Sequence, residues 1–144
     1  MKKNYIFTLL TTLCLTGASF GQYSDLFISM YAEGSSNNKF IEIYNGTGSS
    51  VDLSDYMIKG SNNGGDWKDA RDVALTGTLV DGQVYVISTD QADAAILAVA
   101  DLALPYESPI HYNGDDAIAI FKKNTGGTFD VLDIIGVPTV RPSN

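Results

Sequence analysis

The chain has 144 residues, with 17 acidic and nine basic side chains, a formal net charge of −8, one cysteine and one histidine. This length suits one ordinary domain with its own hydrophobic core. The negative charge disfavours nucleic acid as a partner, because phosphate backbones are bound by lysine and arginine.

The first 21 residues predict a signal peptide. They begin with a methionine and two lysines, and the apolar stretch 6–15 is too short to span a bilayer as a helix. Ser19 and Gly21 then place small residues where a signal peptidase requires them. We therefore expect a secreted protein, whether extracellular, at the cell surface or periplasmic, with residues 22–144 as its single mature domain. An uncleaved anchor is the alternative.

Removal of the signal peptide changes the chemistry of the domain. The two lysines leave, which lowers the net charge from −8 to −10, and Cys14 leaves with them. A mature chain without cysteine has no disulfide bond, although it enters an exported compartment. Its stability must come from the hydrophobic core or from bound ions.

Apolar residues recur with a period of two along most of the mature chain, which predicts β-strands. In the second strand we expect Ile41 and Ile43 on one face and Phe40, Glu42 and Tyr44 on the other. The predicted strands are residues 26–31, 40–44, 56–59, 73–75, 79–80, 83–88, 117–121 and 131–135.

One segment has a helical period. Asp90 can cap a helix whose apolar residues recur at intervals of three and four, and Pro105 ends it. Strands otherwise dominate, and no internal repeat or second apolar stretch of spanning length follows the signal peptide. The pattern predicts an all-β fold, either a β-sandwich or a partly closed barrel, with one short helical crossover.

Four segments follow one another in an informative order. The first, "DLFISMYAEGSSNNKFIEIYNGTGSSVDLSDYMI", has a strand, a Glu-Gly-Ser-Ser turn, a strand with an alternating Glu and an Asn, and a Val-Asp-Leu-Ser turn. It is followed by "LTGTLVDGQVYVIS", "NGDDAIAIFKK" and "DVLDIIG". Together these segments resemble the bacterial lamin-tail domain family over about residues 25–136.

The resemblance implies an immunoglobulin-like β-sandwich of the lamin-tail type. Such domains are accessory modules of secreted or surface proteins, sometimes beside nuclease or phosphatase domains, and the eukaryotic relatives in nuclear lamins contact proteins and chromatin. Two features depart from the family pattern. Met30 stands where bacterial members often have Glu, and only residues 139–141 are left to form a closing edge strand before the chain ends. The closing strand is therefore in doubt, and the chain is either a minimal module or the front of a longer protein.

The sequence contains no recognisable catalytic motif. A single histidine without a cysteine in the mature chain excludes the usual zinc sets, and no nucleophile elbow, P-loop or dinucleotide fingerprint occurs. A Ser–His–Asp arrangement around His111 is an alternative to a surface or loop histidine, since triads assemble in space. We expect no enzyme activity, and hence no catalytic residue.

Asp115 and Asp116 are the candidate metal ligands, with Glu33 as a third. Oxygen-rich clusters suit calcium, which takes six to eight oxygen ligands, but the spacing of a calcium-binding EF-hand is absent. The competing interpretation is structural. Asn113 and Gly114 would then make the left-handed turn of a hairpin, and the aspartates would bond nearby backbone N–H groups. We favour the turn and expect no required cofactor, with calcium as the alternative.

Trp67 is the candidate partner-binding residue, because it lies beside the flexible "SNNGGD" loop and aromatic rings stack on sugars or anchor protein partners. The alternative is that Trp67 folds back over one end of the sandwich. Four tyrosines in or beside strands are expected in the core or in cross-strand pairs. These are Tyr31, Tyr44, Tyr85 and Tyr112.

The leading hypothesis is an exported, non-enzymatic interaction module that contacts a protein, a glycan or its own parent enzyme. An accessory segment of an extracellular hydrolase such as a nuclease is the first alternative, and a free-standing metal-dependent enzyme using acidic residues is the second. Nucleic acid would need a local basic patch. The only small basic clusters are Lys68 with Arg71 and Lys122 with Lys123.

Overall fold

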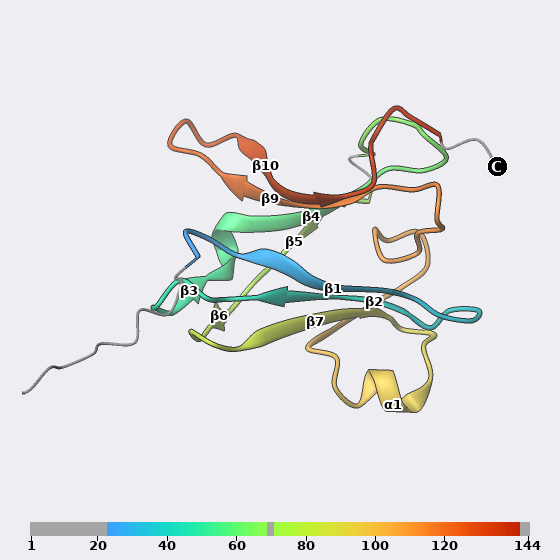
Figure 1. The fold of residues 1–144 in the computed structure, drawn as a ribbon, viewed down its shortest axis with the longest axis horizontal. Helices are drawn as coiled ribbons and strands as arrows, with labels where there is room; N and C mark the ends of the chain where they lie inside the picture. Colours follow the sequence, from blue (N-terminus) through green and yellow to red (C-terminus); the bar gives the residue numbers. More distant parts are fainter. Residues whose placement is uncertain (1–22, 69–70, 142–144) are drawn as a thin grey trace, which may run out of the picture.

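The computed structural model describes residues 23–68 and 71–141, which form two four-stranded sheets packed face to face (Figure 1). The first sheet has the order β1-β2-β7-β8, the second has the order β10-β9-β4-β5, and a small third sheet pairs β3 with β6. The described strands therefore form a β-sandwich, which confirms the predicted all-β fold and selects the sandwich over the partly closed barrel. The elements are β1 Phe27–Glu33, β2 Lys39–Tyr44, β3 Val51–Asp52, η1 Leu53–Asp55, β4 Tyr56–Gly60, β5 Val73–Ala74, β6 Thr78–Leu79, β7 Val84–Thr89, α1 Ala94–Leu97, β8 Leu102–Leu104, β9 Ile118–Lys123 and β10 Phe129–Ile135.

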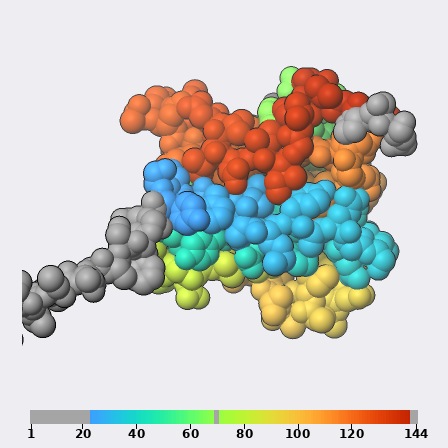
Figure 2. Space-filling view, in the orientation of Figure 1, coloured from blue at the N-terminus to red at the C-terminus, as the bar shows by residue number. Residues whose placement is uncertain are grey.

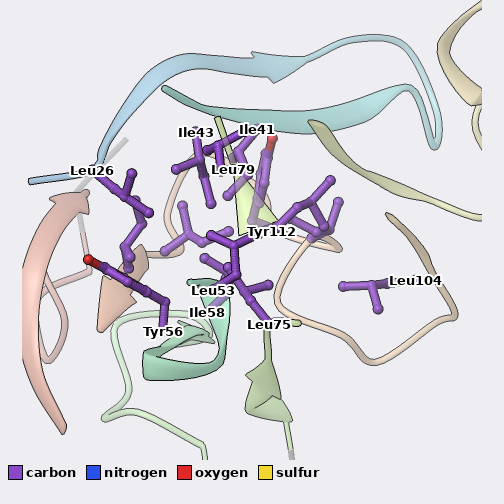
Figure 3. Packing of buried hydrophobic residues seen from close by; sticks show 14 residues of the cluster. Leu26, Ile41, Ile43, Leu53, Tyr56, Ile58, Leu75, Leu79, Leu104 and Tyr112 are labelled. Atoms are coloured by element: carbon purple, nitrogen blue, oxygen red, sulfur yellow. The ribbon is translucent and has the colours of Figure 1, made fainter. Parts of the chain in front are cut away.

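The hydrophobic core lies between the two large sheets (Figure 3). Ile41 and Ile43 of β2 are fully buried, whereas Glu42 between them is only half-buried, so the predicted faces of this strand are confirmed. In the facing sheet, Ile58 of β4 pairs with Ile120 of β9, and both belong to the same core cluster. Each such side chain contributes about 2 kcal/mol through burial. The period of two thus fixes which face of each sheet points inward.

The edge strands β1 and β10 lie next to each other where the two sheets meet. Each edge is interrupted by a β-bulge, between Ile28 and Met30 in β1 and between Val131 and Asp133 in β10. The carboxylate of Asp133 accepts a hydrogen bond of 2.7 Å from the backbone N–H of Ile28. Bulges and charged side chains both hinder the pairing of an edge with another chain. The two edges therefore protect each other without forming a continuous sheet.

The predicted helix between Asp90 and Pro105 is wrong in its extent. Only the single turn α1 is helical, it begins after Asp93, and none of its residues is buried. Further along, the backbone N–H of Asp101 donates to the carbonyl of Val86 (2.9 Å), and the carboxylate of Asp101 accepts from the N–H of Val86 (2.8 Å). These bonds draw the chain back to β7, and the next residues form the parallel strand β8. The short helical crossover itself is confirmed.

The segment after β10 does not close the second sheet. Residues 139–141, the predicted candidate for a closing strand, contain no strand in the part of the chain that the structure describes. Instead, the N–H of Thr139 donates to the carbonyl of Gly65 (2.9 Å). A Cβ atom on Gly64 would lie 2.5 Å from the backbone nitrogen of Arg141, and Gly64 has a φ of +68°. The segment therefore crosses a loop so closely that glycine is required there.

The carboxylate of Asp25 connects the start of the domain to the second sheet. It accepts hydrogen bonds from the N–H of Leu26 (2.9 Å), the hydroxyl of Tyr56 (2.6 Å) and the ammonium of Lys122. Burial alone would raise the pKa of Asp25, but the hydrogen bonds from Lys122, Tyr56 and Leu26 outweigh it and lower the pKa below its usual value. The folded state therefore favours the charged form of this group.

We expect Asp25→Asn to lower the free energy of unfolding by about 2 kcal/mol at neutral pH, since hydrogen bonds to a charged group are lost. A lowered pKa gives stability that is present above the unfolded pKa and is lost as the pH falls through the folded pKa. The variant should therefore lose less stability than the wild type below about pH 4. Urea denaturation across this pH range measures both effects, with Asp81→Asn as the control. Equal acid destabilisation of wild type and Asp25→Asn would contradict the assignment.

Candidate functional site

Three connections gather at one end of the sandwich, which we call the loop end. They are the β1–β2 turn (residues 34–38), the β4–β5 connection (61–72) and the β8–β9 connection (105–117). In Figure 1 they lie at the right, opposite β3 and β6. Figure 2 shows the β1–β2 turn and the β8–β9 connection on the surface at the same end. Segments distant in the sequence therefore build one surface.

A buried lysine ties the first and third of these connections together. Lys39 at the start of β2 is 8% exposed. Its ammonium donates to the carbonyl of Tyr112 and to Oδ1 of Asn113 (3.1 Å), and it lies 3.6 Å from a carboxylate oxygen of Glu33. A buried charge is tolerated only where it is paired and hydrogen-bonded, and here three oxygens meet that requirement. The oxygen-lined space beside Glu33 is therefore occupied by the protein's own cation.

Asp116 ties the second and third connections together. One carboxylate oxygen accepts from the N–H of Asn63 (2.7 Å) and the other from the N–H of Asn113 (2.8 Å). Asp116 is itself buried, and the backbone beside it is anchored because the N–H of Ser61 donates to the carbonyl of Ala117 (2.8 Å). Asp116 thus organises two loops, as the structural interpretation predicts for an aspartate in this position.

The turn that precedes β9 is present but differs from the prediction. The N–H of Asp116 donates to the carbonyl of Asn113 (2.9 Å), which closes a turn. Neither Asn113 nor Gly114 has a positive φ, and the turn leads from β8 to β9, which lie in different sheets. The left-handed hairpin is therefore wrong. The side chain of Asp116 bonds back to the N–H of Asn113 and stabilises a turn that needs no left-handed residue.

The structure gives the three predicted metal candidates separate partners. Glu33 pairs with Lys39, Asp116 binds backbone N–H groups, and a carboxylate oxygen of Asp115 accepts from Nε of Arg141 (2.7 Å). In residues 23–68 and 71–141, no three His, Cys, Asp or Glu side chains are grouped to hold a metal ion. Calcium binding stays a prediction.

Trp67 lies on the outer face of the second sheet. It is half-buried, and its ring meets the ring of Phe121 of β9 edge-on, with centroids 5.2 Å apart. Lys59 lies on the same face, with its ammonium 5.2 Å from the centre of the Phe121 ring, and it also pairs with Asp72 (2.5 Å). The β4–β5 connection therefore folds over this sheet. Trp67 covers a sheet face and not the end of the sandwich, and its role in partner binding stays a prediction.

A polar hollow of about 380 Å³ opens between the three connections. Asparagine is the most frequent residue in its lining, and no described residue brings a carboxylate to it, although the chain as a whole is strongly acidic. The amides come from Asn37, Asn62, Asn63 and Asn113. The remaining lining residues are Ser36, Lys39, Arg71, Tyr106 and His111.

A second hollow of about 440 Å³ adjoins the first and shares Arg71 and Tyr106 with it. Tyr106 is 69% exposed, which is unusual for a large aromatic ring. The ring of Tyr106 also meets the ring of His111 edge-on, with centroids 5.3 Å apart. An exposed ring thus stands between two hollows, where it can stack on a ligand that spans both.

His111 lies beside a serine, but no described residue supplies the third member of a triad. Oγ of Ser108 is 3.2 Å from Nδ1 of His111, whereas Nε2 is buried and has no hydrogen-bond partner among the described residues. Burial lowers the pKa of His111 below its ordinary value; the charge of Asp90 opposes this shift, and those of Arg71 and Lys39 reinforce it. Ser108 is itself buried, so its hydroxyl is poorly placed to attack a substrate. The described residues therefore supply a serine and a histidine but no carboxylate to orient the histidine.

Sequence reasoning missed the hollow. The sequence indicates Arg71 only as part of a small basic cluster and Asn62 only as part of the "SNNGGD" loop, and it gives no signal for Tyr106. One signal was available, because Asn37-Asn38, Asn62-Asn63 and Asn113 place amides in all three connections. Amide-rich loops are usually interpreted as turns, however, and only the fold brings these together.

Comparison with known proteins gives one result for the family. The family model described as Lamin Tail Domain matches residues 21–136. No curated protein matches the chain significantly. No helix in the described part of the chain is long and apolar enough to cross a membrane, and the predicted signal peptide, residues 1–21, lies outside that part.

Proposed function

This chain belongs to the lamin tail domain family, an immunoglobulin-like family, and from that premise we propose that it is an exported, non-enzymatic module that binds glycans at its loop end. The observation that carries the proposal is the amide-lined hollow beside the exposed ring of Tyr106. Asparagine side chains both donate and accept hydrogen bonds, as sugar hydroxyls do. An exposed aromatic ring supplies an apolar face for the ring of a sugar.

A glycan fits the loop end better than a protein partner does. Protein interfaces concentrate their affinity in buried aromatic and apolar anchors surrounded by a polar rim. Here the hollow itself is polar, and the single exposed ring stands at its edge. The two sheets of an immunoglobulin-like sandwich form a rigid scaffold that positions the loops at its ends. Such loops can therefore carry binding residues.

The proposal predicts that Tyr106→Ala weakens glycan binding about tenfold, since stacking on an aromatic ring contributes about 1 kcal/mol or more. The mature domain would be screened on a glycan array, and the affinity for the best ligand measured by calorimetry. Tyr23→Ala is the matched control, because Tyr23 is also exposed but packs on Phe27, away from the loop end. Equal losses in both variants, or no glycan bound at all, would contradict the proposal.

A further inference from the structure

We propose that the loop end selects glycans that carry an acidic group, a carboxylate or a sulfate, which is held by Arg71 together with the side-chain amides of Asn62 and Asn113. This inference rests on the proposed function, and it adds the chemical class of the ligand. It follows from the hydrogen-bond donors that the hollow presents around Arg71.

The acceptors of the two amides are already engaged by cations. Arg71 donates through Nη1 to Oδ1 of Asn62, and Lys39 donates to Oδ1 of Asn113. Each cation therefore holds the oxygen of its amide, and the NH₂ groups of Asn62 and Asn113 remain available to donate to a ligand. Within the described residues, neither NH₂ group has a hydrogen-bond partner.

Arg71 also keeps most of its donors available. A guanidinium has five N–H donors, and Arg71 uses one nitrogen for Asn62. No carboxylate pairs with Arg71 among the described residues, whereas the nearby Asp72 pairs with Lys59. Arginine suits carboxylate and sulfate-like groups because its planar fork donates two parallel hydrogen bonds.

Around Arg71 the hollow therefore presents donors, and among the described residues no carboxylate lines it, in a chain of net charge −8. A neutral sugar would leave the charge of Arg71 without an ionic partner. A nucleic acid would bring a continuous run of phosphates against an acidic surface, which disfavours it.

The test compares four probes by calorimetry on the mature domain: an oligogalacturonate, a sulfated galactan oligosaccharide, cellohexaose and a short oligothymidylate. We expect one or both acidic sugars to bind at least about tenfold more tightly than cellohexaose, which corresponds to about 1.4 kcal/mol. The uronate and sulfate probes distinguish the two sources of the acidic group. Arg71→Gln should remove this preference, whereas Lys123→Gln, which removes one positive charge from the end of β9, should preserve it.

The outcomes separate this inference from the proposed function. If cellohexaose binds as tightly as the acidic sugars and Tyr106→Ala weakens it, the glycan function stands and the acidic preference is wrong. If oligothymidylate binds most tightly, the inference is wrong and a phosphate-binding surface replaces it. If none of the four probes binds, the acidic preference is wrong, and the glycan array alone then decides the proposed function. Arg71→Lys keeps the positive charge but not the planar fork, so it should bind acidic sugars more tightly than Arg71→Gln and less tightly than the wild type. Such an intermediate affinity would show that the loss in Arg71→Gln is not a failure to fold.

Discussion

Replacing Tyr112 by alanine should lower the free energy of unfolding by about 4 kcal/mol, because large aromatic side chains lose both burial and packing when they are truncated in a core. Tyr112 is 1% exposed and stacks on Tyr31 with ring centroids 4.4 Å apart. Its hydroxyl lies 2.8 Å from the carbonyls of both Ala32 and Phe40. Urea denaturation of the mature domain measures the loss.

The same substitution should also abolish ligand binding at the loop end. Tyr112 anchors the β8–β9 connection to the first sheet, and its carbonyl holds the ammonium of Lys39. Tyr112→Phe is the matched control, since it keeps the ring and removes one hydroxyl; we expect it to cost about 1 kcal/mol and to leave binding nearly intact. If Tyr112→Ala bound the glycan as tightly as the wild type, the connection would not depend on this anchor.

We expect Asn45→Ala to lower the free energy of unfolding by about 3 kcal/mol, although it removes only a small polar side chain. Asn45 is fully buried after β2. Its amide nitrogen donates to the carbonyls of Ser49 (2.9 Å) and Leu79 (2.7 Å), and its oxygen accepts from the N–H of Thr47 (3.0 Å). Alanine would leave the carbonyl of Leu79 without this buried hydrogen bond, and an unsatisfied buried group costs about 1–3 kcal/mol. Thermal and urea denaturation measure the loss.

Asn124→Ala is the control for this effect. Asn124 also holds a turn, because its oxygen accepts from the N–H groups of Gly126 (2.9 Å) and Thr128 (3.1 Å), but that turn is exposed. Water can replace the lost partners there, so we expect a cost of about 1 kcal/mol or less. Equal losses in the two variants would show that burial is not what makes Asn45 important. Because Asn45 bonds to Leu79 of β6, which lies opposite the loop end (Figure 1), folded Asn45→Ala should still bind the ligand.

Much of the fold could be predicted because it depends on local alternation. Ile41 and Ile43 of β2 alternate with half-buried residues, and one face of each sheet must be apolar for the two sheets to pack. The family segments supplied the remaining information, since they place the turns between the strands in one order. Fold class and family are therefore both confirmed.

The extent of the helix could not be predicted, because a contact distant in the sequence decides it. The spacing of Ala95, Ile96 and Val99 is helical, yet Asp101 bonds to Val86 and turns the following residues into a strand. Local periodicity does not report such a bond. The left-handed turn predicted at Asn113 is wrong partly for the same reason, since the carboxylate of Asp116, which closes that turn, also accepts a hydrogen bond from the distant N–H of Asn63.

The candidate site could not be predicted from the sequence, because its residues come together only in the folded domain. Arg71 and Asn62 belong to one connection and Asn113 to another, and only the packing of the two sheets brings them to one hollow. The predicted metal candidates illustrate the opposite case. Glu33 and Asp116 are close to the loop end, but each is engaged by a partner that no spacing indicates: the ammonium of Lys39 for one and backbone N–H groups for the other.

The most direct test of the loop end as a binding site is a nitrogen–proton correlation NMR spectrum of the mature domain, recorded while an oligogalacturonate or a sulfated galactan oligosaccharide is added. If the loop end binds the sugar, the side-chain NH₂ signals of Asn62 and Asn113 and the guanidinium signal of Arg71 will shift with increasing ligand, while the signals of Asn45 and Asn124 stay in place. Saturable shifts confined to residues outside the loop end, with these three groups unmoved, would contradict the account.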